Sequence, residues 1–251
     1  MKAILFSLLF FTASLSFAQQ HCSENMKDND GRKQGLWVDT LGNYTLKGHY
    51  VNDLKDGVWI SYDSETEKIL KIEDFKAGKK DGVFLEFNKR NNTLASEQYY
   101  SNDLPDGKFK LYSVSGMLES TSSYKNGELD GLQQKFYENS NKPSEEANYL
   151  KGVKEGLSKW YNQDGKLIAE YNYLNGDLNG EQKTYFPDGT LRSVDTYVKN
   201  VYEGMSTEYY ENGKVKLQGL YKAGAKDGKW IKCNDSGAVI STIQYKNGVE
   251  K

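Results

Sequence analysis

The sequence predicts an all-β protein, an elongated single-layer antiparallel meander of about nine β-hairpins that coils into a twisted ribbon. Two observations predict this class. A glycine recurs every 22 to 25 residues over most of the chain, and the composition is polar and aromatic, with 37% hydrophobic, 27% charged and 13% aromatic residues. Such a chain has too few aliphatic residues for a two-layer sandwich or an α/β domain. Its aromatic content argues against disorder.

The recurring glycine divides the chain into nine units. A near-constant period indicates a repeat architecture, in which each unit packs on its neighbours. We therefore expect a repeat domain over residues 35–251, preceded by a polar segment over residues 19–34. The glycines that open the units are Gly35, Gly57, Gly82, Gly107, Gly131, Gly156, Gly180, Gly204 and Gly228.

Each unit is predicted to form a strand, a turn, a second strand and a second turn. An aromatic residue generally stands at the sixth position and another at the eighteenth, with a turn glycine between them. Asn-Gly, Asp-Gly and Pro-Asp-Gly sequences suit hairpin turns, because these residues tolerate positive φ or preset φ. The second strand alternates at period two. Trp59 and Tyr62 are three residues apart, which predicts a bulge in the first strand or aromatic side chains on both faces.

The first eighteen residues are predicted to be a secretory signal peptide. Lys2 precedes an apolar run from Ala3 to Phe11, and Ser16-Phe17-Ala18 forms a small-x-small cleavage site. We expect cleavage after Ala18 and a secreted or periplasmic protein. Loss of Lys2 leaves 32 basic and 35 acidic side chains, a net charge of -3. This balance favours neither nucleic acid nor an anionic membrane surface as a partner.

The units resemble the MORN repeat in its bacterial variant form. The phrase Y-x-N-G-x-x-x-G-x-[aromatic]-x-x-[Tyr/Phe] fits from about Gly35 to Lys251, and residues 173–185 and 221–231 show it well. The resemblance implies a single-layer sheet of hairpins without catalytic residues. Some bacterial proteins with this variant are labelled antitoxins, and other MORN proteins are scaffolds or bind membrane lipids. The chain departs from the phrase in its longer period, and tryptophan holds the third position only at Trp37, Trp59 and Trp230.

The sequence predicts no enzyme, no cofactor and no metal site. It holds two histidines, His21 and His49, too few for a histidine-based triad or metal cluster. An acidic or amide residue precedes each opening glycine, as Asp56 precedes Gly57. One carboxylate per unit, roughly 10 Å from the next, cannot share a cation. We interpret this row as solvated residues of Asp-Gly turns.

Aromatic side chains at the sixth and eighteenth positions are the candidate binding face. They could line a groove for a glycan, a peptide or a protein, although cross-strand aromatic pairs also hold a thin sheet together. The candidate residues are Tyr112, Tyr161, Tyr185, Tyr209, Tyr173, Tyr197 and Tyr221.

The C-terminal strand is the candidate edge for strand addition, through Ile240, Ile243 and Tyr245. An apolar last strand invites pairing with another chain, so self-association through this edge is expected. Cys22 and Cys233 stand at opposite ends of the predicted ribbon, beyond the ~7 Å limit for bridging, so no intramolecular disulfide is expected.

These features favour an exported, non-enzymatic protein-binding or scaffold module at the cell envelope, with a protein or a cell-surface component as its partner. The alternative is an antitoxin or immunity protein that neutralises a toxin by direct binding. A signal peptide disfavours a cytoplasmic antitoxin and leaves room for immunity against a toxin that acts in the envelope.

Overall fold

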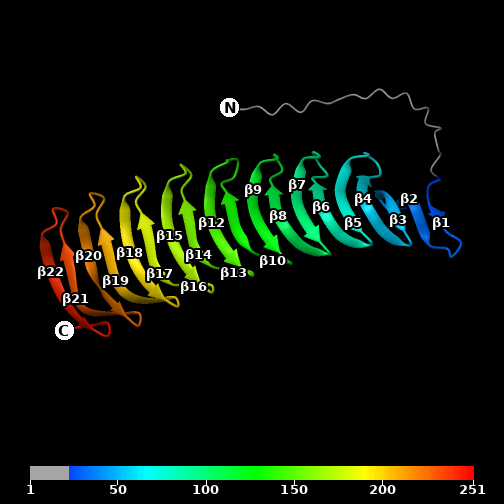
Figure 1. Cartoon of the computed structure of the whole chain (residues 1–251). Coiled ribbons are helices and arrows are strands. Elements are labelled where there is room, and N and C mark those ends of the chain that lie inside the picture. Colours follow the sequence, from blue (N-terminus) through cyan, green and yellow to red (C-terminus); the bar gives the residue numbers. More distant parts are fainter. Residues whose placement is uncertain (1–22) are drawn as a thin grey trace, which may run out of the picture.

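The computed structural model describes residues 23–251, which form one open antiparallel sheet of 23 strands. Strands that follow one another in sequence lie side by side, from β1 at one end to β22 at the other (Figure 1). The predicted fold class is confirmed. The predicted signal peptide and Cys22 lie outside the described residues, and the described part contains no helix long and apolar enough to cross a membrane.

Nine long hairpins correspond to the nine units. Each consists of a first strand and an antiparallel return strand. The first five hairpins are β2 (Lys33–Leu41) with β3 (Tyr44–Val51), β4 (Leu54–Asp63) with β5 (Ile69–Lys76), β6 (Lys79–Phe87) with β7 (Leu94–Ser101), β8 (Leu104–Tyr112) with β9 (Leu118–Lys125), and β11 (Gly131–Phe136) with β12 (Pro143–Leu150). The last four are β14 (Gly156–Tyr161) with β15 (Leu167–Leu174), β17 (Gly180–Tyr185) with β18 (Leu191–Val198), β19 (Val201–Tyr209) with β20 (Val215–Lys222), and β21 (Ala225–Cys233) with β22 (Val239–Lys246).

Five strands of two residues complete the sheet. β1 (Met26–Lys27) and β23 (Val249–Glu250) lie at the two ends of the chain. The other three are β10 (Glu128–Leu129), β13 (Val153–Lys154) and β16 (Asp177–Leu178). Each of these three short strands is the beginning of a first strand. A break at the opening glycine separates it from the longer part of that strand. In the other hairpins the strand runs through this glycine without a break, so the division does not change the architecture.

Two-residue turns join successive hairpins along one long edge of the ribbon, which we call the turn edge. At Asn126-Gly127 the φ angles are 50° and 89°, and at Asn52-Asp53 they are 50° and 67°. Positive φ at both central residues defines the turn type whose twist matches that of paired strands. The Asn-Gly sequences thus act as predicted.

The opening glycines lie inside the first strands rather than in the turns. Gly57 has φ of 74°, and the register between β3 and β4 shifts between Lys47 and His49, opposite this glycine. The glycine therefore forms a bulge, where an L residue with a side chain would be strained. Trp59 and Tyr62 lie on opposite faces, because their positions differ by three within a continuous strand.

The acidic row fastens the units to one another, a role that its interpretation as solvated turn residues does not include. Each of seven carboxylates accepts a hydrogen bond from the first turn amide of the next unit, with donor–acceptor distances from 2.7 to 3.4 Å. The second turn amide donates to a backbone carbonyl of the same preceding strand, as Gly127 N does to Pro105 O at 2.8 Å. The acceptors are Asp56, Asp81, Asp106, Asp130, Glu155, Glu203 and Asp227.

The core is thin and consists largely of aromatic rings on one face. Trp59, with 1% of its surface exposed, lies directly on the backbone of Gly48 in the preceding strand, and Trp230, with 3% exposed, lies on Gly219. A Cβ atom at Gly48 would stand 2.3 Å from the Trp59 ring. The indole N–H of Trp59 donates to His49 O at 3.1 Å. The large ring and the missing side chain therefore fit together as a pair.

Candidate functional site

The two faces of the sheet carry different side chains. We call the face that holds Trp37, Trp59, Phe84, Phe109 and Trp230 the aromatic face. Direct cross-strand partners share a face of a sheet. Gly57 pairs with Phe75, and Gly228 pairs with Tyr245. Each glycine shares a face with the tryptophan two residues further along its own strand, Trp59 or Trp230. The eighteenth-position aromatic residues therefore lie on the aromatic face.

Rings on the aromatic face contact one another across the strands. Tyr50 lies between Trp37 and Trp59, with ring centroids 5.7 and 4.8 Å away. Near the other end, Tyr202 lies between Tyr197 and Tyr221 at 4.2 and 4.7 Å. Such cross-strand pairs stabilise the sheet beyond the burial of their area.

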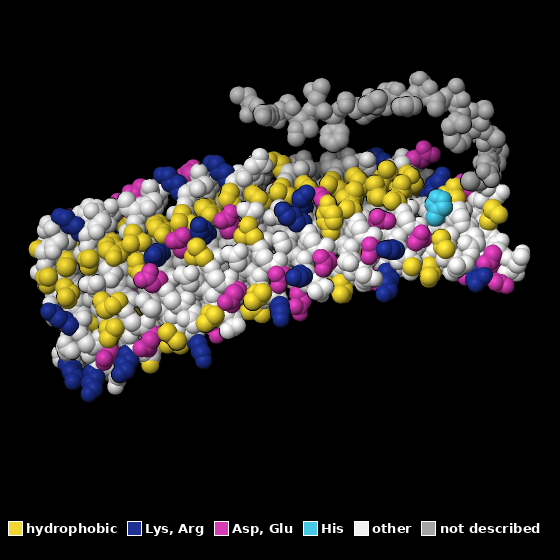
Figure 2. All heavy atoms as spheres, viewed as in Figure 1, with side chains coloured by type: hydrophobic (Ala, Val, Ile, Leu, Met, Phe, Trp, Pro, Cys, Tyr) yellow, Lys and Arg dark blue, Asp and Glu magenta, His cyan; other side chains and the backbone are white. Residues whose placement is uncertain are grey.

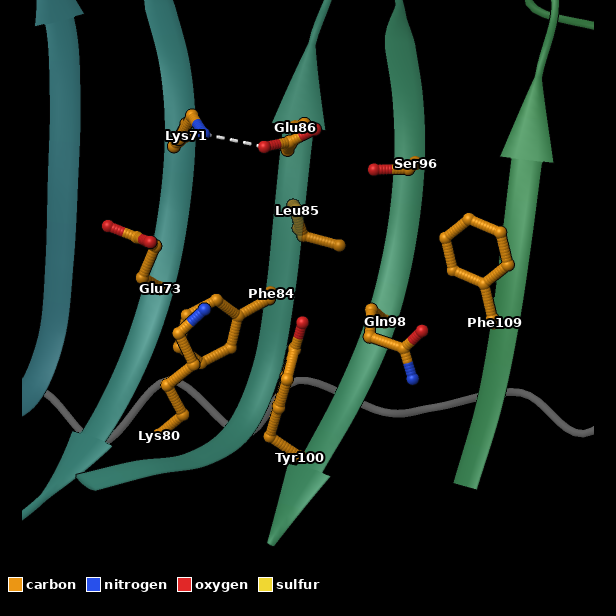
Figure 3. Close-up of a pocket in the computed structure, with 10 residues that line it drawn as sticks. All are labelled: Lys71, Glu73, Lys80, Phe84, Leu85, Glu86, Ser96, Gln98, Tyr100 and Phe109. Carbon is orange, nitrogen blue, oxygen red and sulfur yellow. Dashed lines mark hydrogen bonds and ion pairs between the residues drawn. The ribbon is translucent and has the colours of Figure 1, made fainter. Parts of the chain in front are cut away.

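A lysine covers two aromatic rings in five of the units. Lys80 Nζ lies 4.9 Å from the Phe84 centroid and 4.8 Å from the Tyr100 centroid (Figure 3). The same arrangement recurs at Lys33, Lys55, Lys154 and Lys226. The cation and the aliphatic stem both favour the ring faces. These lysines therefore take up ring area that a ligand would otherwise contact.

The seven candidate tyrosines do not share one face. Tyr173, Tyr197 and Tyr221 belong to the aromatic face. The sixth-position set, Tyr112, Tyr161, Tyr185 and Tyr209, lies on the opposite face, because each is an odd number of residues from the third position of its strand. The two sets therefore do not line one continuous groove, although Tyr209 and Tyr221 both border a hollow across β17 to β20.

Tyrosine–glutamate pairs join neighbouring units on the opposite face. The Tyr161 hydroxyl donates to Glu146 Oε2 at 2.9 Å, and the Tyr185 hydroxyl donates to Glu170 Oε2 at 2.7 Å. Burial, with the hydrogen bond to glutamate second, raises the pKa of both tyrosines to about 12. These two residues therefore have a defined structural role.

The stability of the folded protein is expected to fall between pH ~10, where an unfolded tyrosine ionises, and pH about 12, where Tyr161 and Tyr185 ionise in the folded chain. A folded-state pKa above the unfolded value favours folding only while the hydroxyl keeps its proton. Phenolate absorbance during alkaline titration measures this. Glu146→Gln should move the Tyr161 transition to lower pH, and unchanged titration would contradict the assigned pair.

Two shallow hollows open on the aromatic face. The first, of about 200 Å³, lies across β5 to β8 beside Lys80 and Phe84, where Lys71 Nζ is 2.6 Å from Glu86 Oε1 (Figure 3). The second, of about 510 Å³, lies across β17 to β20. At its floor the Ser206 hydroxyl donates to Asp195 Oδ1 at 2.6 Å. This small polar pair occupies the place that tryptophan and glycine fill in the last two units.

Aliphatic side chains form a row along the turn edge. They flank the two-residue turns and are exposed by 43 to 53% at three successive turns. The Val153 side chain reaches the next turn, where it would lie 3.2 Å from a Cβ atom at Gly176. Figure 2 shows hydrophobic side chains along the lower rim, where Figure 1 places β10, β13 and β16. We call Leu150, Val153, Leu174, Val198 and Val201 the turn-edge row.

The sequence contains a signal for this row that period-two reasoning does not use. An aliphatic residue stands on one or both sides of a turn pair in V-ND-L (51–54), L-KG-V (150–153) and V-KN-V (198–201). Such residues end one strand and begin the next, so they gather at one rim. Contiguous exposed apolar side chains are typical of interaction sites.

The described residues offer little for catalysis. Within residues 23–251, no group of three or more His, Cys, Asp or Glu side chains is placed to hold a metal ion. Some carboxylates form ion pairs between strands, such as Glu145 with Lys135 at 2.8 Å and with Lys154 at 3.1 Å.

The architecture defines the class as a single-layer repeat protein of β-hairpins. The family model for the MORN repeat variant matches residues 154–175, 178–199 and 202–223. Each match runs from just after one two-residue turn to the first residue of the next. Residues 154–223 therefore contain three consecutive MORN repeats of the variant type, as the sequence resemblance predicted. MORN repeats are non-catalytic modules that bind proteins or membranes. No curated protein matches the chain.

Proposed function

We propose that the protein is an exported scaffold that binds a protein at the cell envelope through the turn-edge row. The observation that carries the proposal is the row itself. Five aliphatic side chains on three successive turns are each 43 to 53% exposed. Partially exposed aliphatic groups at a regular spacing gain free energy when a partner removes them from water.

The three matched repeats coincide with the densest part of the row. Leu150 and Val153 stand just before the first match, Leu174 and Val198 lie in the first and second matches, and Val201 stands just before the third. The turn before the row is flanked by Lys125 and Glu128, and the turn after it has Lys222 on one side. Charged side chains therefore adjoin the apolar stretch at both ends, as in a docking surface with a polar rim.

The signal-like leader supports export. Its basic start, apolar run and small-x-small site are features of a cleaved secretory segment. We expect the protein in envelope or extracellular fractions as a chain that begins at Gln19. Recovery of the intact leader from the cytoplasm would contradict this part of the proposal.

Crosslinked capture from envelope fractions tests the binding surface. Leu150→Glu with Val198→Glu is expected to reduce capture of the partner at least tenfold, because two carboxylates would be buried in the contact. Val114→Glu is the matched control, since Val114 is 60% exposed at a turn of the opposite long edge. Equal capture by all three proteins would disprove the proposed surface. A toxin as captured partner would favour the immunity function over the scaffold.

A further inference from the structure

The two ends of the sheet differ in how their outer backbone groups are satisfied. At the N-terminal end, Asn25 covers β2. Its side-chain amide donates to Val38 O at 3.0 Å and accepts from Val38 N at 2.8 Å, while its backbone N–H donates to Leu36 O at 2.9 Å. β1 then pairs with Lys33 and Gln34. The chain itself therefore closes the outer edge of β2 from Lys33 to Val38.

The C-terminal end lacks an equivalent cover over most of its length. β22 pairs with β21 on its inner side from Tyr245 to Val239. On its outer side it pairs with β23 only at Tyr245 and Lys246, and Gln244 O accepts a hydrogen bond from Lys251 N at 2.9 Å.

Because Gln244 O points to the outer side of β22, it shows which backbone N–H and C=O groups of this strand point outward. Along an antiparallel strand, alternate residues direct their N–H and C=O groups to the same side. Thr242 therefore directs its N–H and C=O outward, as Gln244 does, and within residues 23–251 no strand pairs with it there. The alternation ends at Ile240, where the register with β21 shifts between Lys232 and Cys233. Exposed N–H and C=O groups of this kind are a template for another strand.

The side chains of β22 are also unusual among the nine return strands. Its first seven residues, Val239 to Tyr245, carry no charge. Each of the other eight return strands has a charged residue in that stretch, as at Lys47, Lys71, Glu97, Glu119, Glu145, Glu170, Asp195 and Lys216. Natural edge strands usually carry charges that prevent pairing. Here the one return strand at an edge is the uncharged one, and its Val239 and Ile240 are 61% and 56% exposed.

We propose that β22 pairs with β22 of a second copy of this chain, antiparallel and with Ser241 on the two-fold axis. Thr242 of each copy then lies opposite the partner's Ile240, so that the outward N–H and C=O groups of Thr242 meet the partner's backbone. β23 and Lys251 already occupy the edge beyond Ile243, which limits the paired stretch to Val239–Ile243.

The cross-strand neighbours in this register are compatible. Ile243 stands opposite the partner's Val239, Ser241 stands opposite the partner's Ser241, and Ile240 stands opposite the partner's Thr242. Apolar and hydroxyl pairs of this kind favour strand association, and no like charges oppose each other. The partner is therefore another β22 rather than a charged strand.

The two-fold axis stands perpendicular to the sheet, so both copies present the aromatic face to the same side. The dimer is a continuous ribbon of eighteen hairpins with a covered β2 at each end. Because Asn25 and β1 cover the outer edge of each β2 from Lys33 to Val38, we expect the assembly to stop at two copies. This arrangement is independent of the proposed exported scaffold function, since it needs no other protein.

Sedimentation or light scattering of the purified protein over a concentration series tests the inference. The native chain is expected to reach twice the monomer mass. Thr242→Pro should remain a monomer at every concentration, because it removes the outward N–H of Thr242 and no hydrogen bond to β21. Val114→Lys, an equally exposed position away from the edge, should dimerise like the native chain.

Far-ultraviolet circular dichroism and thermal melting establish that Thr242→Pro is folded, and Ile240→Lys supplies a second variant with an unchanged backbone. A native chain that is monomeric throughout, a folded Thr242→Pro that dimerises, or growth beyond two copies would each overturn the inference. Capture of a partner by the turn-edge row is a separate measurement, so a failure of either proposal leaves the other intact.

Discussion

Gly219→Ala is expected to destabilise the C-terminal units by about 3 kcal/mol, and Gly48→Ala to do the same at the N-terminal end. A Cβ atom at Gly219 would stand 2.2 Å from the Trp230 ring, a distance that real contacts do not allow. Neither glycine has positive φ, so the alanine backbone itself is not strained. The cost arises from displacement of a buried indole and the loss of its hydrogen bond to Leu220 O, now at 3.1 Å.

Denaturant titration with hydrogen exchange measures this effect, since a repeat array can lose its terminal units before the rest. Trp230→Ser in the Gly219→Ala background supplies the control. The chain itself places Ala147 opposite Ser158 at the same repeat positions, with Ala147 1% and Ser158 0% exposed. The alanine should therefore cost little once the ring is absent. An equal cost in both backgrounds would show that ring contact is not the cause.

The fold class could be predicted because its signals are local and repeated. The periodic glycine and the Asn-Gly pairs each specify a conformation at one place, and Gly127 with φ of 89° adopts it. Because the same signal occurs in nine units, one regular arrangement of hairpins satisfies all of them. The MORN resemblance rested on the same residues, and the matches over residues 154–223 confirm it.

The division of the aromatic residues between the two faces could not be predicted from the period alone. Tyr161 and Tyr173 are twelve residues apart, which would place them on one face of an uninterrupted strand. The hairpin turn and the register shift between Trp160 and Tyr161 change the parity, and Tyr173 lies on the other face. The two positions therefore lie on different faces of the sheet, and the binding role of either set stays a prediction.

The pairing of tryptophan with glycine had a readable signal. Gly48 and Gly219 each stand eleven residues before a tryptophan, and glycine inside a strand indicates close approach of another group. The acidic row could not be interpreted in the same way. Its hydrogen bonds cross from one unit to the next, and only the register between hairpins shows that Asp130 meets the amide of Lys151.

Asp63→Asn is expected to cause the largest loss of stability at neutral pH among substitutions of a carboxyl group. Asp63 is 2% exposed at the end of β4. It accepts hydrogen bonds from Thr66 N at 3.0 Å and Thr66 Oγ1 at 2.8 Å, and Lys89 Nζ, from the turn of the next hairpin, lies 2.7 Å away. One carboxylate thus organises its own turn and ties it to the neighbouring unit.

The hydrogen bond from Lys89, followed by those from Thr66, holds the pKa of the Asp63 carboxyl well below its usual range. A lowered folded-state pKa stabilises the fold fully above the unfolded value, ~3.9 for aspartate, and this contribution disappears as the pH falls toward the folded value. The native chain should therefore lose stability more steeply below pH ~4 than Asp63→Asn, whose side chain does not ionise.

Melting temperatures between neutral and strongly acidic pH distinguish this explanation from general acid unfolding. The gap between the native chain and Asp63→Asn should narrow as the pH falls, because protonation removes from the native protein the charge that the variant already lacks. Lys89→Gln should weaken the acid dependence, since the cation is the main cause of the lowered pKa. Parallel melting curves at all pH values would show that the buried contact with Lys89 contributes no stability, and the link between the two turns would then rest on the backbone alone.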